Sequence, residues 1–117
     1  MKVIRILFCQ CLALTAVLAG FNVYAVDQSI CHSGANVSLY SDGSLKACQL
    51  KSDYAVSYDA NSIRCKKDGP VSFYTNGNLE SCVLSIPTSI DMIKCKQNGL
   101  ISLYIDGKLK SCVKPDN

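Results

Sequence analysis

Six of the eight cysteines of this chain form three pairs, and the two members of each pair stand seventeen positions apart. The segments that they enclose are residues 31–48, 65–82 and 95–112. Each segment contains an apolar-Ser-apolar-Tyr run, then an Asp-Gly or Asn-Gly dipeptide, and then a leucine. A recurring segment with a cysteine at both ends predicts a repeat protein held together by disulfide bonds.

The Asp-Gly and Asn-Gly dipeptides predict the local structure of each repeat. They stand between short runs rich in Val, Leu, Ile, Phe and Tyr, and this combination is the strongest short-range indication of a β-hairpin. The sequence therefore predicts an all-β fold, an antiparallel meander or roll built from three disulfide-stapled β-hairpin repeats. The expected turn-forming residues are Asp42, Gly43, Asn76, Gly77, Asp106 and Gly107.

Two loop lengths are open for these hairpins, and they distribute the side chains differently. A two-residue turn in the first repeat pairs Tyr40 with Leu45 and mixes apolar and polar side chains on both faces. A three-residue loop, with Gly43 left-handed in a bulge, pairs Leu39 with Leu45 and gathers apolar side chains on one face. Because a slip of one residue reverses the faces, this coherence favours the three-residue loop. The apolar face is then expected to hold Val37, Leu39, Leu45 and Ala47, and the opposite face Ser38, Tyr40, Lys46 and Cys48.

The two linkers between the repeats, residues 49–64 and 83–94, show no convincing helical period. Their Ser, Asp and Pro content with scattered apolar residues favours strand ends and loops. Val56-Ser57-Tyr58 weakly echoes the repeat motif and suggests a decayed hairpin. A glycine turn before each hairpin indicates that the strand carrying the first cysteine of a repeat turns into the next strand.

The N-terminus has the three regions of a secretory signal peptide. Lys2 and Arg5 precede an apolar stretch that ends at Leu18, and small residues follow it. A membrane span needs about 20 consecutive apolar residues, and polar residues interrupt this stretch. We therefore expect residues 1–25 to be removed and residues 26–117 to form a single β-repeat domain, exported to the periplasm or secreted.

The chain that remains after this cleavage has 92 residues, six cysteines and a net charge of +1. An even number of cysteines in a small exported chain favours three disulfides over free thiols. The nearly balanced charge predicts no strongly basic or acidic partner and no binding of nucleic acid. Because a domain of this size buries a limited apolar core, the disulfides are expected to contribute much of its stability.

The pairing of the six cysteines has two plausible solutions on sequence grounds. The constant spacing within repeats favours Cys31–Cys48, Cys65–Cys82 and Cys95–Cys112. In a flat meander, however, the cysteines of one repeat flank a middle strand and stand roughly 9 to 10 Å apart. That separation exceeds the Cα distance of about 7 Å that a disulfide spans. The alternative pairs Cys48–Cys65 and Cys82–Cys95, which leaves Cys31 and Cys112 to close the ends.

The sequence offers no arrangement of residues typical of a catalytic or metal site. Zinc sites use close ligand pairs such as Cys-x-x-Cys, which this sequence lacks, and its single histidine is His32. It also lacks the Gly-x-Ser-x-Gly motif of serine hydrolases. Ser38, Ser72 and Ser102 are better explained as solvent-facing strand positions, and the turn aspartates as turn formers. We expect a protein that is not an enzyme and uses no cofactor or metal.

Three tyrosines, Tyr40, Tyr74 and Tyr104, occupy equivalent positions and are expected to line up on one face. One interpretation is a ladder that packs against the disulfides. The other is an exposed binding strip, because tyrosine is favoured at recognition surfaces. The closely spaced lysines at positions 94, 96, 108 and 110 are better explained as solvated edge residues that oppose aggregation of strands.

The element from Phe73 to Leu79, Phe-Tyr-Thr-Asn-Gly-Asn-Leu, recurs in related form from Leu39 to Leu45 and from Leu103 to Leu109. It resembles the Tyr-x-Asn/Asp-Gly-x-Leu core of MORN-repeat variants found in exported bacterial proteins. Together with the flanking cysteines, it looks like the cysteine-bearing branch of that group over residues 31–112. This resemblance implies a repeated β-sheet scaffold and no catalytic residues.

These observations leave two functional hypotheses. The first is a non-enzymatic binding or structural module of the periplasm, envelope or extracellular space, whose partner is an unknown protein or envelope component. Under this hypothesis the protein is not expected to associate with a membrane once the signal peptide is removed. The second is a small secreted effector, a toxin or hydrolase inhibitor, that makes contact through hairpin tips such as Ser41-Asp42-Gly43.

Overall fold

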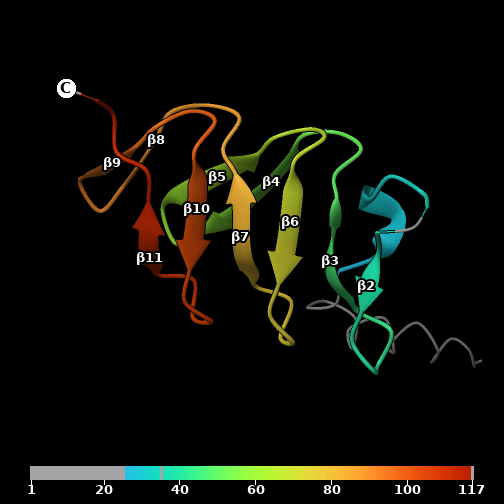
Figure 1. Cartoon of the computed structure of the whole chain (residues 1–117). Helices are drawn as coiled ribbons and strands as arrows, with labels where there is room; N and C mark the ends of the chain where they lie inside the picture. Colours follow the sequence, from blue (N-terminus) through green and yellow to red (C-terminus); the bar gives the residue numbers. More distant parts are fainter. Residues whose placement is uncertain (1–25, 35, 117) are drawn as a thin grey trace, which may run out of the picture.

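The computed structural model describes residues 26–34 and 36–116, which contain almost only β-structure (Figure 1). The expected signal peptide, residues 1–25, lies outside the described residues. Within the described ranges, no helix has the length and apolar character needed to cross a membrane. A short 3-10 turn, η3 (Gln28–Ile30), comes first. The strands that follow are β2 (Ser38–Leu39), β3 (Leu45–Gln49), β4 (Tyr54–Tyr58), β5 (Asn61–Cys65), β6 (Pro70–Phe73), β7 (Leu79–Val83), β8 (Thr88–Ile90), β9 (Ile93–Cys95), β10 (Leu100–Leu103) and β11 (Leu109–Cys112).

Six of these strands form one antiparallel sheet in the order β2, β3, β6, β7, β10, β11. Each repeat supplies one hairpin, and the second strand of a hairpin pairs with the first strand of the next hairpin (Figure 1). The arrangement confirms the predicted antiparallel meander of three hairpin repeats.

The hairpin loops have the predicted three-residue form. In the first repeat the Gly43 N–H donates to the Tyr40 carbonyl at 2.9 Å, and Leu39 pairs with Leu45 just outside the loop. Gly43 has a φ of 90°, which suits glycine because it lacks a Cβ. The other two hairpins repeat this geometry, with Gly77 at 88°, Gly107 at 91°, and the pairs Phe73–Leu79 and Leu103–Leu109.

A β-bulge in each hairpin changes which side chains share a face. In the first hairpin two consecutive residues of β2, Ser38 and Leu39, pair with Ala47 and Leu45, so that Lys46 is an extra residue in β3. An extra residue on one strand interrupts the alternation of side chains beyond it. The same register shift occurs in the second and third hairpins.

The bulge makes two of the predicted face assignments wrong. Cys48, expected opposite Leu45, is 6% exposed and lies in the same buried core as Leu45. Ala47, expected beside Leu45, instead pairs with Ser38 and Ser72 in a row of small side chains on the other face. The prediction failed because it assumed unbroken alternation along β3.

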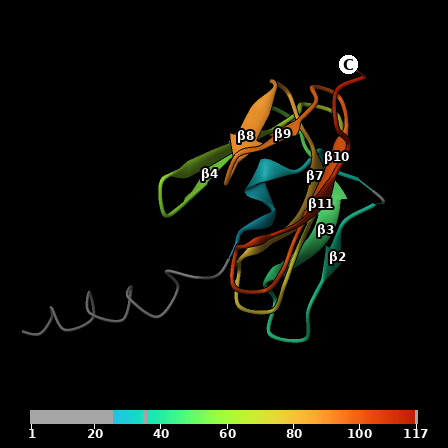
Figure 2. The same ribbon diagram turned by 90° about the vertical axis from the view of Figure 1, so that its left-hand side faces the viewer.

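The linkers form a second layer, whereas strand ends, loops and one decayed hairpin at Val56-Ser57-Tyr58 were predicted. One linker folds into the hairpin β4–β5, which includes Val56-Ser57-Tyr58, and the other folds into the hairpin β8–β9. Figure 2 shows both hairpins on one side of the six-stranded sheet. Their turns contain no glycine, and left-handed backbone is supplied by Asp59 (φ 53°), Asp91 (φ 51°) and Met92 (φ 71°). Without a glycine, these turns carried little sequence signal.

The core lies between the inner face of the sheet and these two hairpins. Phe73 is its largest fully buried side chain, and its ring meets that of Tyr54 edge to face at 6.0 Å between centroids. Fully burying a side chain of this kind stabilises the fold by about 1.5 to 3 kcal/mol. The other large side chains buried to 2% exposure or less are Leu45, Leu50, Ile63, Val71, Leu79, Leu84, Ile90, Ile101 and Leu103.

Each disulfide joins the two cysteines of one repeat, which settles the open question of pairing. The entering strand leaves the plane of the sheet: Cys65 ends β5 in the second layer and lies across from Cys82 in β7. The distance argument against this pairing assumed a flat sheet and does not apply. The bonded pairs are Cys31–Cys48, Cys65–Cys82 and Cys95–Cys112, with Cα separations of 5.9, 5.6 and 5.5 Å.

Candidate functional site

The outer face of the six-stranded sheet is a regular surface that neither linker hairpin covers (Figure 2). Both linker hairpins lie on the opposite, inner face (Figure 2). Side chains of successive strands therefore stand beside one another on the outer face at the inter-strand spacing of about 4.8 Å. Two disulfides, from β5 and β9, hold the sheet to the second layer, and Cys31–Cys48 ties the N-terminal segment to β3. Together they limit the deformation of the sheet.

A row of small side chains crosses this face from one edge of the sheet to the other. The members pair with one another in succession across all six strands, and five of the six are serines. The hydroxyls of Ser72 and Ser81 are hydrogen-bonded at 2.8 Å between oxygens. The row, defined here as the serine row, consists of Ser38, Ala47, Ser72, Ser81, Ser102 and Ser111. The serines predicted to face solvent thus belong to one continuous feature.

An apolar row lies two residues along the strands from the serine row. Leu100 is 48% exposed and Val113 is 44% exposed, which is unusual for neighbouring aliphatic side chains on one face. Leu100 pairs directly with Val83 in the adjacent strand. The members of this apolar row are Pro70, Val83, Leu100 and Val113.

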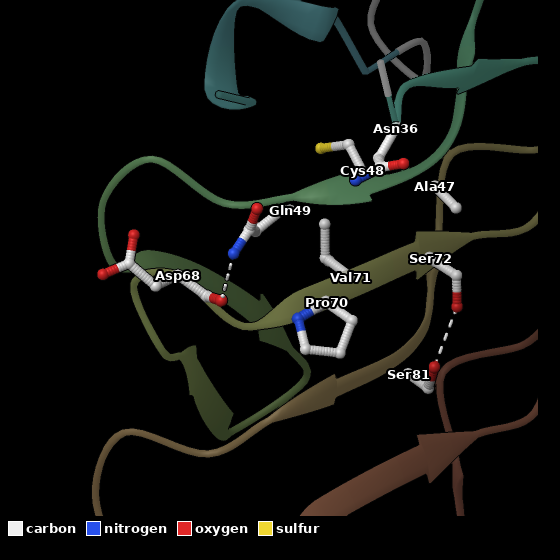
Figure 3. A pocket seen from close by; sticks show the side chains of 9 residues that line it. All are labelled: Asn36, Ala47, Cys48, Gln49, Asp68, Pro70, Val71, Ser72 and Ser81. Carbon is white, nitrogen blue, oxygen red and sulfur yellow. Dashed lines mark hydrogen bonds between the residues drawn. The ribbon is translucent and has the colours of Figure 1, made fainter. Parts of the chain in front are cut away.

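A shallow depression of about 480 Å³ lies over the first half of the two rows (Figure 3). Its floor is low because Ala47, Ser72 and Ser81 have short side chains. At its rim the Gln49 amide donates to the Asp68 carbonyl at 3.0 Å, as the dashed line in Figure 3 shows. The depression is an open contact surface that combines hydroxyl, amide and apolar groups.

The three repeat tyrosines do not share one environment. The Tyr40 hydroxyl donates to the Phe73 carbonyl at 2.7 Å, and the Tyr74 hydroxyl donates to the Leu103 carbonyl at 2.8 Å. Both rings are partly buried. Tyr104 is 51% exposed, with the Lys110 ammonium 5.8 Å from its ring centroid. Tyr40 and Tyr74 therefore link one repeat to the next. Tyr104, in the last repeat, is the one repeat tyrosine with an exposed ring.

A tyrosine outside the repeats also makes a structural hydrogen bond. The Tyr58 hydroxyl, in the linker hairpin β4–β5, accepts a hydrogen bond from the Leu79 N–H at 2.7 Å. Burial raises the pKa of Tyr58 above its ordinary value, against a smaller opposing effect of the Leu79 hydrogen bond. Burial and the neighbouring Tyr58 raise the pKa of Tyr54. Val56-Ser57-Tyr58 only weakly echoes the repeat motif, and sequence reasoning did not identify this contact.

The predicted turn residues organise the hairpin tips. The Asp42 carboxylate accepts hydrogen bonds from the hydroxyl and the backbone N–H of Ser44, and these bonds lower the pKa of Asp42. Asn76 and Asp106 accept the corresponding bonds from the N–H two residues later. The tips of the second and third hairpins are also joined, because the Asn78 amide donates to the Ile105 carbonyl at 2.8 Å.

The described residues contain no group of three or more His, Cys, Asp or Glu side chains placed to hold a metal ion. All six cysteines of residues 26–34 and 36–116 are in disulfides. His32 forms a 2.7 Å contact with Asp68 at the surface, where such pairs contribute about 1 kcal/mol or less. This contact joins the first and second repeats.

Comparison of the chain with known protein families, with curated protein sequences and with solved structures gave no match. The resemblance to MORN-repeat variants therefore rests on the repeat motif alone.

Proposed function

We propose that this protein is an exported, non-enzymatic binding module that contacts a protein or envelope component through the outer face of its sheet. The observation that carries the proposal is the exposed apolar row beside the serine row. A contiguous set of exposed aliphatic side chains is typical of a contact site. Small side chains beside it allow a partner to approach the backbone closely, and a rigid surface loses little entropy on binding.

Two observations support export. The described fold contains three disulfides, which persist in oxidising compartments such as the periplasm and the extracellular space. The N-terminal residues have the charge and apolar pattern of a signal peptide. The resemblance to MORN-repeat variants of exported bacterial proteins points to the same compartment.

The export proposal is tested by the intact mass of the native protein before and after reduction with alkylation. The expected product begins at Val26 and is six hydrogens lighter than its reduced form, because three disulfides remove six hydrogens. A product that retains the first 25 residues and stays in the reducing cytosol would contradict export.

The binding proposal is tested by chemical crosslinking of the oxidised protein in the envelope and extracellular fractions of its source cells. Ser81→Arg places a long charged side chain in the serine row, and we expect it to reduce the crosslinked product at least about tenfold, the effect of roughly 1.4 kcal/mol. Ser62→Arg is the matched control, because Ser62 is an exposed strand serine of the second layer.

Two outcomes would contradict the proposed surface. A crosslinked product that survives Ser81→Arg and is lost with Ser62→Arg would place the contact on the second layer. A product lost only with Ser41→Arg would favour a secreted effector that acts through its hairpin tips. A complete lack of crosslinked product in either fraction would contradict the binding function itself.

A further inference from the structure

Each repeat is joined to the next by the same set of contacts. The second strand of one hairpin pairs with the first strand of the next in equivalent register, with Ala47 opposite Ser72 and Ser81 opposite Ser102. At both junctions the tyrosine of the earlier repeat donates its hydroxyl to a strand-end carbonyl of the later repeat. The interface between repeats is therefore formed twice within the chain.

The backbone beyond the second strand contributes equally to both junctions. Leu50 donates to the Gly69 carbonyl at 3.0 Å, and Leu84 donates to the Gly99 carbonyl at 3.0 Å. Longer side chains repeat as well, because His32 contacts Asp68 and Lys66 donates to Asn98 at 2.8 Å. Strand pairing, the tyrosine hydroxyl, the leucine backbone and these side chains thus recur at both junctions, which makes the junction a defined, reusable interface.

Within the described residues, the donor side of this interface in the last repeat meets no further repeat. Tyr104 is 51% exposed, and within residues 26–34 and 36–116 its hydroxyl donates no hydrogen bond to protein. Leu109 is only partly buried, whereas Leu45 and Leu79 at the same position are 1% and 0% exposed. Strand β11 with Tyr104 and Leu109 is defined here as the tail edge.

The acceptor side of the interface in the first repeat likewise meets no other repeat in the part of the chain that the structure describes. Leu39 is 44% exposed, whereas Phe73 and Leu103 at the same position are 1% and 0% exposed. Val37 is also only partly buried, while its equivalents Val71 and Ile101 are fully buried, at 2% and 0% exposure. Strand β2 with Val37 and Leu39 is defined here as the head edge. It lies at the opposite end of the sheet from the tail edge (Figure 1).

We propose that the tail edge binds the head edge of a second copy of this chain and thereby continues the sheet from one molecule to the next. By equivalence with the two internal junctions, Ser111 lies opposite Ser38 of the second copy and the Tyr104 hydroxyl donates to its Leu39 carbonyl. The occupant is a second copy because the contact is continuous with an interface that this chain already forms twice. Addition of a strand to an exposed sheet edge is an established mode of protein association.

The hairpin tips add a charged contact at the proposed junction. Within the chain the Asn78 amide reaches the next tip at Ile105. Lys108 occupies the position of Asn78 in the last repeat, so its ammonium would reach the first tip of the second copy, which carries Asp42. The hydrogen bonds from Ser44 lower the pKa of Asp42 and favour its ionised form. One position of the proposed junction differs from the internal ones. Leu50 is buried, whereas Lys114 at the same position after the third repeat is exposed, so only the backbone of Lys114 would take part in the contact.

The proposed contact is heterologous, because two different edges meet. Each molecule added leaves one free head edge and one free tail edge, so growth continues into a filament unless curvature closes a ring. In such an assembly the serine row and the apolar row extend across every copy. This inference goes beyond the proposed binding function, and either can fail without the other.

The test is sedimentation velocity of the oxidised, exported protein over a wide range of concentrations. The wild type is expected to form larger species as its concentration rises. Leu39→Asp blocks the head edge and Tyr104→Asp blocks the tail edge, so each variant alone is expected to remain a monomer. An equimolar mixture of the two is expected to form a dimer and nothing larger, because only one intact head edge and one intact tail edge remain to meet.

The matched control is Leu100→Asp, since Leu100 is 48% exposed on the outer face and Leu39 is 44% exposed at the edge. Assembly is expected to survive this control. If an aspartate variant lacks its disulfides or its β-sheet circular dichroism, Tyr104→Phe replaces it, and we expect that variant to weaken association several-fold through the lost hydroxyl.

Three results would overturn the inference. One is a wild type that stays monomeric at every concentration. Another is a folded single-edge variant that still forms dimers by itself, which would show that like edges meet. The third is loss of assembly with Leu100→Asp but not with Leu39→Asp, which would place the contact on the outer face. The crosslinking test with Ser81→Arg addresses the proposed binding function separately.

Discussion

The second and third repeats have closely similar sequences and the same hairpin, bulge and disulfide, yet they are not equally buried. Leu79 of the second repeat is 0% exposed and the Tyr74 hydroxyl is bonded to the next repeat. Leu109 and Tyr104, at the same positions in the third repeat, are partly and largely exposed. The second repeat differs in having a repeat on either side. Burial in this fold therefore depends on the neighbour as much as on the residue, as expected for a linear repeat protein.

The largest effect that tests this difference concerns the disulfides. In the chain-entropy model, bridges that close loops of equal length contribute equally, about 3 kcal/mol each. Cys65 and Cys82 are both fully buried, whereas Cys112 is partly exposed. Double replacement by alanine should therefore lower the free energy of unfolding more for Cys65/Cys82 than for Cys95/Cys112. Urea denaturation of the two variants measures this, and equal losses would show that the neighbours make no difference to the bridges.

A smaller effect is expected from truncating the leucine that follows each turn. Leu79→Ala should cost about 2 to 5 kcal/mol, because a cavity opens in a fully buried site. Leu109→Ala should cost less than half as much, since part of that side chain already contacts water. The measurement is the shift in the midpoint of urea unfolding at a concentration where the protein is monomeric. A larger loss for Leu109→Ala would contradict our explanation of the comparison.

Removing single hydroxyls should give a smaller effect again. Tyr74→Phe deletes the hydrogen bond to the Leu103 carbonyl and should lower the free energy of unfolding by about 0.5 to 1.5 kcal/mol. Tyr104→Phe, the matched control, should leave the monomer unchanged. Thermal unfolding of dilute protein followed by circular dichroism is sufficient to compare them. An equal loss at both positions would mean that the Tyr104 hydroxyl has an intramolecular partner.

The smallest expected effect is a loss of stability at alkaline pH, which is caused by two tyrosines of the hairpin β4–β5. Burial raises the pKa of Tyr54 and Tyr58 in the folded protein. In the unfolded chain both ionise near their ordinary pKa of about 10. Their contribution to the free energy of unfolding is therefore complete below that pH and decreases as the pH rises above it. Urea unfolding at about pH 9 and about pH 11 measures the loss, and Tyr54→Phe should reduce it. No difference between that variant and the wild type would contradict the assignment to Tyr54.

The hairpins could be predicted from sequence because their information is local. An Asp-Gly or Asn-Gly dipeptide determines the turn, and the pairing of Leu39 with Leu45 follows from the loop length. The cysteine spacing correctly favoured pairing within repeats. The disulfides and the loop geometry depend on residues fewer than twenty positions apart, and no strand pair that joins two repeats of the meander is more than 25 positions apart.

The rest of the fold depends on contacts that local patterns do not encode. The bulge at Lys46 moved Cys48 to the core face, because nothing in the turn specifies where an extra residue is accommodated. Of the second layer, only the hairpin at Val56-Ser57-Tyr58 was suggested by the sequence, because both of its turns use residues such as Asp59 and Asp91 in place of glycine.

The candidate site was predicted only in part for the same reason. The solvent-facing serines were identified from their strand positions, while the apolar row became visible only when the sheet register was known. The different environments of Tyr74 and Tyr104 follow from their places in the stack, which their nearly identical local sequences do not reveal.

The crossing of the Cys65–Cys82 disulfide from the second layer to the sheet has a consequence for how fast a reducing thiol can break it. A reducing thiol must reach a sulfur atom in line to exchange with it. Cys65 and Cys82 have no exposed surface, so the attacking thiol must wait until the β4–β5 hairpin lifts from the sheet. Once the reductant is concentrated enough for exchange to outpace reclosing, the rate of reduction equals the rate of local opening and stops rising with the concentration of reductant. The rate at which the Cys65–Cys82 disulfide is reduced would then measure how often the two layers separate.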